Sequence, residues 1–233
     1  MTRTLGPAEL LALWEEGATA APSGRAFGVL NAAGIDEPIA MTIGQRDQAL
    51  LACHERWFGG SLEALTSCPA CGEALDVVLS VDDLRVNVAP PGSCRVEQDG
   101  FEVDVRLPTA GDLDPPPFDV AELLDRCVLT VRHEGVDVAA ADLPEPVIAA
   151  VDAALAEADP ASPLVIAMSC PACGHPWQAT LEPVDFVWDG VDRSARRLCD
   201  EVHVLASAYG WTEDAILALS PRRRRLYLEA VVG

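Results

Sequence analysis

SCPACG occupies residues 67–72, and the same six letters recur at residues 169–174. Each copy carries two cysteines separated by two residues, a spacing that directs two thiolates at one point and supplies half of a tetrahedral zinc site. Proline after the first cysteine presets φ for a turn, and glycine after the second accepts the positive φ of a tight knuckle. The two copies together predict one closed structural Zn²⁺ site, whose ligands are Cys68, Cys71, Cys170 and Cys173.

The separation of the two copies predicts how the chain is organised. They lie 102 residues apart, too far for the repeats of a solenoid. We therefore expect a zinc-ribbon-like unit in two halves, a first knuckle and strand at residues 67–82 and a second knuckle and strands at residues 164–186. A mixed α/β segment at residues 83–163 is inserted between them. Four thiolates fill the coordination sphere of zinc, so this metal leaves no position open for water or substrate.

Strand patterning follows the first knuckle. Apolar and polar residues alternate in ALDVVLSV (74–81), LRVNVAP (84–90) and FEVDVRLP (101–108). GDLDPPPFD (111–119) predicts a loop, because three consecutive prolines cannot continue a helix or a strand ladder. SPLVIAMS (162–169) reads as a buried strand. Strands are therefore predicted both beside the knuckles and within the insert.

Helical patterning dominates the rest of the chain. We expect an N-terminal helical segment at residues 1–66, and the helices predicted from sequence cover residues 7–17, 45–57, 120–130 and 146–157. From Val191 to Tyr209 apolar residues recur at steps of four and three, which predicts a helix with a narrow packing seam. Signals for helix ends and starts follow at Gly210, Thr212, Ser220 and Pro221. They predict a C-terminal helical unit at residues 187–233, which completes an α+β fold.

Charge is distributed unevenly along the chain. All 16 basic residues are arginines; residues 1–192 hold nine of them against 32 acids, whereas residues 193–233 hold seven against five. A body this acidic repels phosphate backbones and anionic lipid, so nucleic acid is not an expected partner for most of the surface. Half of the residues are apolar, which excludes a disordered protein, and no apolar run reaches the ~18–20 residues that span a bilayer. We expect a cytoplasmic protein without membrane contact.

The basic residues of the C-terminal unit suggest a docking surface. Arg222, Arg223, Arg224 and Arg225 stand at the start of the last predicted helix, where arginine opposes the helix dipole unless carboxylates are near. We expect them to pair with acidic groups of this chain or of a protein partner. Two aromatic residues of the same unit complete the predicted partner-binding set: Trp211 and Tyr227.

Other candidate sites are weaker. Cys53, Cys94, Cys127 and Cys199 share no spacing and are expected to be small hydrophobic residues of the core. The chain has no glycine-rich phosphate loop, no nucleophile elbow and no paired-carboxylate motif, so we expect neither catalytic residues nor a small-molecule substrate.

Two alternative functions remain open on sequence grounds. CPAC resembles the dithiol of thiol-disulfide oxidoreductases, whose first thiolate sits at the start of a long helix. The arginine run and the knuckles could instead belong to a zinc-ribbon regulator that binds nucleic acid. The first alternative requires a helix directly after the motif, and the second requires a DNA affinity that falls steeply with salt.

Five stretches together resemble a family of bacterial proteins encoded beside contractile, phage-tail-like injection systems. They occupy residues 57–76 (preceded by RDQALL at 46–51), 106–114, 143–160, 169–188 and 201–231. The last stretch is similar to baseplate-related proteins of contractile-tailed bacteriophages.

The resemblance is densest over residues 164–232 and covers most of the chain. It implies an accessory or assembly role at a baseplate, with baseplate or tail proteins of a contractile injection particle as partners. It supplies no catalytic residues.

Overall fold

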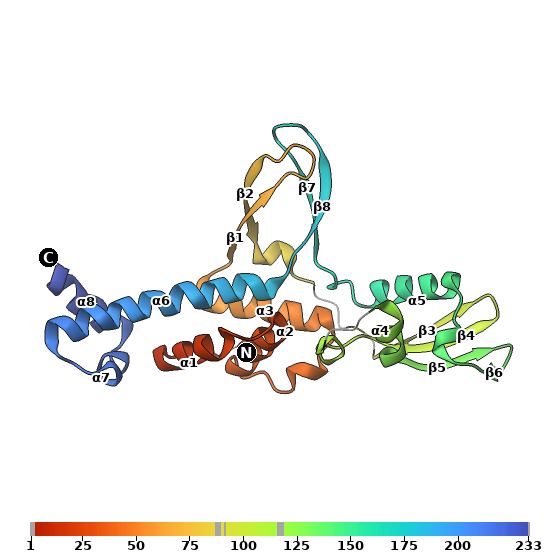
Figure 1. Cartoon of the computed structure of the whole chain (residues 1–233), viewed down its shortest axis with the longest axis horizontal. Helices are drawn as coiled ribbons and strands as arrows, with labels where there is room; N and C mark the ends of the chain where they lie inside the picture. The colour runs from red at the N-terminus through yellow and green to blue at the C-terminus, as the bar shows by residue number, and fades with distance from the viewer. Residues whose placement is uncertain (1–2, 87–89, 91, 116–118, 233) are drawn as a thin grey trace.

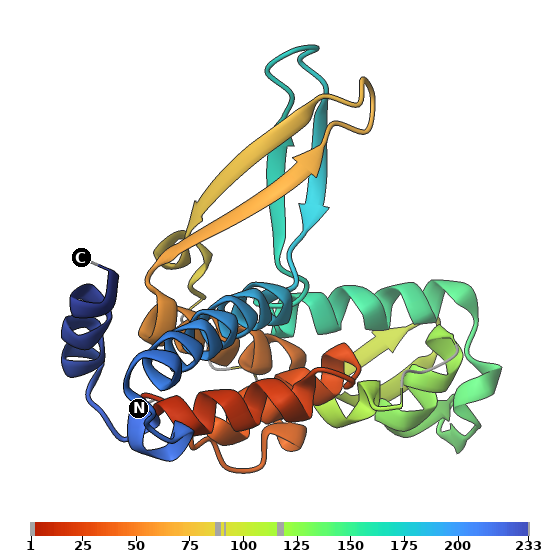
Figure 2. The same cartoon turned by 60° about the vertical axis from the view of Figure 1, so that its left-hand side comes forward.

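The computed structural model describes residues 3–86, 90, 92–115 and 119–232. It shows a mixed α and β protein, as the sequence predicts, in which helices form an elongated body and two β-hairpins rise from it as an arm (Figure 1). A small antiparallel sheet with two helices lies at one end of the body, and the C-terminal helices lie at the other (Figures 1 and 2).

Four helices build the body, and their bounds are α1 Pro7–Gly17, α2 Pro22–Ala32, α3 Ile43–Phe58 and α6 Pro183–Tyr209. The buried side chains where they meet include Val29, Leu30, Leu50, Val187 and Val191. Two glycines allow the helices to approach closely. A Cβ at Gly17 would lie 2.2 Å from the ring of Trp188, and one at Gly190 would lie 2.4 Å from the ring of Phe58.

The sequence predicts most of this body. α1 and α3 lie where helices are expected at residues 7–17 and 45–57, and α6 ends before Gly210, whose φ is 65°. α6 begins at Pro183, earlier than the predicted seam, because proline at the first turn of a helix costs no backbone hydrogen bond. α2 is not predicted, since PSGRAFGVLNA contains small residues and two glycines instead of a strong apolar period.

The arm consists of two antiparallel hairpins. Their strands are β1 Ser61–Ser67 and β2 Ala74–Ser80 in one, and β7 Val165–Ser169 and β8 Pro176–Thr180 in the other. The hairpins converge at the tip of the arm (Figure 2). At its base a small core joins them to the body, formed by Leu51, Leu62, Val81, Leu164 and Leu181. The strand predicted as buried, at residues 162–169, is only half-buried, because the hairpin has a second layer on one side alone.

The insert forms its own sheet and core. Its strands follow the order β3-β4-β5-β6, with bounds β3 Ser93–Gln98, β4 Phe101–Arg106, β5 Val128–His133 and β6 Val136–Asp137. Its helices are α4 Val120–Cys127 and α5 Glu145–Ala158. Its fully buried side chains include Val103, Val105, Val147 and Val151. Four short 3₁₀ turns connect elements of the described chain: η1 Pro38–Ala40, η2 Val81–Leu84, η3 Ala110–Leu113 and η4 Ala140–Asp142.

Three predictions for the insert need correction or stay open. The helix expected over residues 120–130 ends at Cys127, because the β-branched run from Val128 pairs with β4 instead. A strand is expected over residues 84–90, but its first residue, Leu84, is the last residue of η2. Residues 87–89 of this stretch lie outside the described chain. The loop expected over residues 111–119 begins as η3, and its residues 116–118 are likewise not described.

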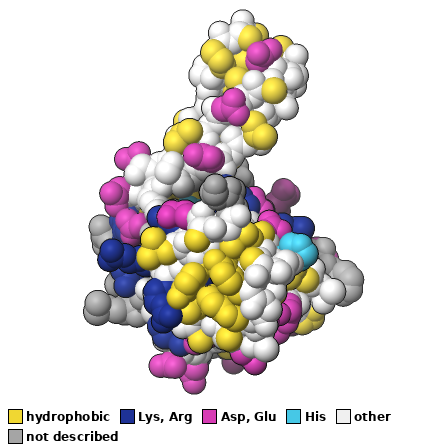
Figure 3. All heavy atoms as spheres, turned by 90° about the vertical axis from the view of Figure 1, so that its left-hand side faces the viewer, with side chains coloured by type: hydrophobic (Ala, Val, Ile, Leu, Met, Phe, Trp, Pro, Cys, Tyr) yellow, Lys and Arg dark blue, Asp and Glu magenta, His cyan; other side chains and the backbone are white. Residues whose placement is uncertain are grey.

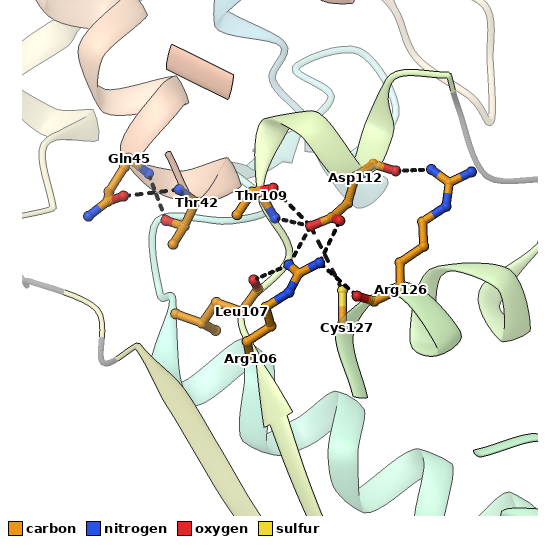
Figure 4. A network of polar contacts seen from close by, with 8 residues as sticks. All are labelled: Thr42, Gln45, Arg106, Leu107, Thr109, Asp112, Arg126 and Cys127. Atoms are coloured by element: carbon orange, nitrogen blue, oxygen red, sulfur yellow. Dashed lines mark hydrogen bonds and ion pairs between the residues drawn. The ribbon is translucent and has the colours of Figure 1, made fainter. Parts of the chain in front are cut away.

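A polar network ties the insert to the body (Figure 4). Arg106 donates two hydrogen bonds to the carboxylate of Asp112, at 2.6 and 2.7 Å, and one to the backbone oxygen of Arg126 at 2.7 Å. The same carboxylate accepts from the N–H of Thr109 at 2.7 Å, and the Arg106 guanidinium lowers the pKa of Asp112 to about 2. Thr109 forms an isolated antiparallel β-bridge with Thr42, and Thr42 caps the start of α3. The network therefore fixes the end of β4 against the body.

A second polar junction lies where α3, the end of α5 and the base of the arm meet. Asp159 at the end of α5 accepts a hydrogen bond from the N–H of Gly44 at 3.0 Å. Asp47 on α3 is 4% exposed and pairs with Arg46 at 2.7 Å. Burial raises the pKa of Asp47 to about 6. The positive charge of Arg46 lowers this pKa, whereas the negative charges of Glu182 and Asp159 raise it. The junction therefore carries an electrostatic cost at neutral pH.

Because the folded protein holds a proton on Asp47 more tightly than the unfolded chain does, this residue should make stability fall as pH rises. The loss should develop between pH 4 and about 6 and amount to about 3 kcal/mol at most. Asp47→Asn should remove this component, which urea unfolding across that range would detect as a difference from wild type. Asp83→Asn, at an exposed position on η2, is the control. Parallel curves for wild type and Asp47→Asn would contradict the assignment.

Candidate metal centre

The two knuckles form the tip of the arm. Cys68 and Cys71 lie in the turn between β1 and β2, and Cys170 and Cys173 lie in the turn between β7 and β8. The two turns share one pattern of backbone hydrogen bonds. The N–H of the first cysteine donates to the backbone oxygen of the residue five positions later, at 2.8 Å in the first turn and 3.0 Å in the second. The backbone oxygen of the same cysteine accepts from the N–H of the knuckle glycine, at 2.9 Å in both turns. Both knuckle glycines adopt positive φ, 76° and 73°, as the sequence predicts.

The geometry of the four sulfur atoms fits a tetrahedral metal. The Cys68 and Cys173 Sγ atoms are 3.7 Å apart, the Cys71 and Cys170 Sγ atoms are also 3.7 Å apart, and all four lie within 4.8 Å of one another. Zinc–sulfur bonds of about 2.3 Å give a tetrahedron whose edge is about 3.8 Å. A disulfide would bring two sulfurs to about 2.05 Å. The cluster therefore has the donor set and spacing of a four-thiolate site.

The electrostatic interactions within the cluster favour a bound cation. Burial opposes ionisation of Cys68, but the N–H groups of Cys71 and Ala70 and the neighbouring thiols lower its pKa to about 7. The N–H of Glu73 favours the thiolate of Cys71, yet the sulfurs of Cys173 and Cys68 raise the pKa of Cys71 to about 12. Four thiolates this close repel one another, and a divalent cation would stabilise all four together.

The surroundings of the motifs differ from those of a redox dithiol. In thioredoxin-like enzymes the first cysteine begins a long helix, whose N-terminus stabilises the thiolate. Here strands flank each motif on both sides, and the first cysteine of each pair is buried. The requirement set by the oxidoreductase alternative is therefore not met at either knuckle.

The other cysteines take no part in the cluster. Cys53 and Cys127 are buried, and desolvation raises their pKa values to about 12 and about 11, as expected for core residues. Cys94 is half-buried. Cys199 is predicted to lie in the core, but it is exposed. The buried face of α6 includes Leu198, and the next residue along the helix points to solvent.

The C-terminal helices are α7 Glu213–Leu217 and α8 Pro221–Val232, capped by Thr212 and Ser220 as the sequence predicts. Arg224 differs from the other three arginines, because it is buried and donates to Glu201 of α6 at 2.8 Å and to the backbone oxygen of Leu219 at 3.1 Å. It holds α8 against α6. Across the described residues, no helix combines the length and the apolar character needed to cross a membrane.

The remaining predicted docking residues gather at this end of the molecule. Arg222, Arg223 and Arg225 are exposed and form no ion pair with any described residue. The rings of Trp211 and Tyr227 meet edge to face at 5.0 Å. The Tyr209 ring stacks on Trp211 at 4.7 Å. Three apolar residues of this end that the sequence did not assign to the docking surface are exposed: Tyr209, Leu226 and Val231. Figure 3 views the molecule from this end and shows a hydrophobic patch with basic side chains along one side.

Removal of one ligand should weaken metal binding strongly. Wild-type protein should carry one zinc per chain by elemental analysis, and Cys170→Ser should carry far less than one, because a three-thiolate site binds zinc much more weakly. We expect the melting temperature to fall by about 10 °C, as for a loss of about 3 kcal/mol. Cys199→Ser, which changes an exposed thiol outside the cluster, should retain both properties. A full complement of zinc in Cys170→Ser would exclude the four-thiolate site.

Comparison with known proteins places most of the chain in one family. The model of the family described as "T4 bacteriophage base plate protein" matches residues 29–187, more than two thirds of the chain. No curated protein and no solved structure matches the chain significantly. The matched span contains both knuckles and the whole insert but ends inside α6, so most of residues 164–232, where the resemblance was expected to be densest, lies beyond it. The chain belongs to the T4 bacteriophage base plate protein family.

Proposed function

We propose that the protein is a non-enzymatic accessory or assembly component of the baseplate of a contractile, phage-tail-like injection particle, acting in the cytoplasm. The family match over residues 29–187 is the observation that carries this proposal. In this role the protein holds Zn²⁺ for structure and binds baseplate or tail proteins through its C-terminal helices.

The role of zinc follows from the weakness of the arm without it. A two-stranded hairpin is only marginally stable by itself, and the strands of the arm bury few side chains beyond its base. Four metal–sulfur bonds at the tip would join two segments that are far apart in sequence. The metal would thereby hold both hairpins in one orientation relative to the body.

The C-terminal end has the composition of a docking surface. Exposed aromatic and aliphatic side chains offer contact area, and the free arginines around them can form bidentate hydrogen bonds with carboxylates. We expect the partner to present an apolar pocket rimmed by acidic residues. Arg224 supports this surface indirectly, because its ion pair with Glu201 fixes the helix that carries the others.

Nucleic acid is less well supported as the partner. Binding to a duplex requires cations that reach several phosphates, and Arg224 is committed to Glu201 inside the protein. The exposed arginines surround apolar side chains, a composition typical of protein interfaces.

Reversing the charge of two arginines should test the docking surface. Arg222 and Arg225 share one face of α8, and changing both to glutamate should weaken co-purification with baseplate proteins at least tenfold. Arg56→Glu with Arg132→Glu makes the same charge change on the body and the insert and should leave binding intact. Unchanged binding by Arg222→Glu/Arg225→Glu would remove this surface from the proposal.

A further inference from the structure

A groove runs between the outer face of the β1–β2 hairpin and α6. Two adjoining hollows, of about 450 and 680 Å³, share Glu63, Phe186, Asp189 and Arg193 in their walls, so they form one continuous groove. We call it the arm groove. It lies at the base of the arm, whereas α8 lies at the far end of α6 (Figure 1).

The strand wall of the arm groove is unusually apolar for an exposed surface. Leu65 on β1 is 82% exposed and Val78 on β2 is 68% exposed. Strand alternation places both on the outer face of the hairpin, opposite the face of Leu62 and Leu79, which point toward the other hairpin. Phe186 of α6 extends the apolar surface along the groove. Exposed apolar side chains gathered in a concave surface mark a protein interaction site.

The charges of the arm groove define its occupant. Four exposed carboxylates line it, and none of them forms an ion pair with a described residue: Glu63, Asp76, Asp185 and Asp189. The cation in its wall is Arg193, whose Nε donates to the backbone oxygen of Asp189 at 3.3 Å. An apolar partner without cations would remove water from these carboxylates, and no ion pair would offset the free-energy cost of that desolvation. The occupant must therefore combine apolar and basic side chains.

We propose that the arm groove binds a basic amphipathic helix of a partner protein. The apolar stripe of that helix packs on Leu65, Val78 and Phe186, and its arginine or lysine side chains reach the carboxylates on both walls. A helix suits the space because one wall is a sheet face and the other a helix, and both pack against a helix about 10 Å across. The basic C-terminal end of the same chain cannot fill the groove, because the rigid run of α6 from Asp189 to Tyr209 separates them by about 30 Å.

The test uses a synthetic 16-residue helical peptide with leucines on one face and arginines on the other, measured by fluorescence anisotropy. Leu65→Thr/Val78→Thr keeps both the net charge and the strand propensity of the hairpin, so the loss of apolar contact is its main effect. We expect it to weaken binding at least tenfold. Leu129→Thr/Val136→Thr makes the same change at exposed residues of the insert and should bind like wild type.

The charge half of the proposal needs a separate comparison. Asp185→Asn/Asp189→Asn should weaken binding more than Asp83→Asn/Glu97→Gln, which removes the same charge elsewhere. Equal losses in the two pairs, or equal losses in the two threonine pairs, would mean general attraction to an acidic protein and would overturn the proposal. Failure of wild type to bind the peptide would also overturn it.

A second copy of the chain is the competing occupant. Self-association seen by sedimentation, and lost in both Leu65→Thr/Val78→Thr and Arg222→Glu/Arg225→Glu, would assign the arm groove to that copy and overturn the helix proposal. Peptide binding that survives Arg222→Glu/Arg225→Glu is the expected result. The arm groove and the C-terminal docking surface are separate sites, so a failed test of one leaves the other standing.

Discussion

The convergence of four cysteine sulfurs at one point is the constraint on which this structure depends. Two hairpins, from parts of the chain about a hundred residues apart, meet at the base of the arm and at its tip. The base is held by a small apolar core. Among the described residues no buried apolar cluster lies at the tip, and the 3.7 Å spacings between sulfurs of opposite hairpins fit ligands around one ion. Zinc would thus supply the cohesion that side-chain burial does not.

The long helix α6 sets the positions of the other features. It starts directly after the second hairpin, packs through its buried face on α1, α2 and α3, and carries the C-terminal helices at its end. The ion pair between Arg224 and Glu201 extends this rigidity to α8. The arm groove and the C-terminal surface therefore lie at a fixed separation, with opposite charge. Such an arrangement suits a protein that holds two components in a defined relation, as an accessory component of a baseplate would.

The sequence predicts the parts of the fold that depend on local signals. The knuckles, the helix caps at Thr212 and Ser220 and the αL end of α6 at Gly210 each require particular residue types at fixed positions. Elements set by tertiary contact are less predictable. The run from Val128 becomes a strand because β4 offers it a partner, and β1 and α2 lack a strong apolar period of their own. Likewise, no local signal separates Arg224, which is buried against α6, from the three exposed arginines beside it.

The most direct test of the account is zinc X-ray absorption spectroscopy on freshly purified protein. One zinc per chain, with four sulfur neighbours at about 2.3 Å and no nitrogen or oxygen in the first shell, is the predicted result. A spectrum fitted by fewer than four sulfurs, or a protein that carries no metal and instead holds a disulfide within either knuckle, would contradict the claim that both knuckles bind one ion.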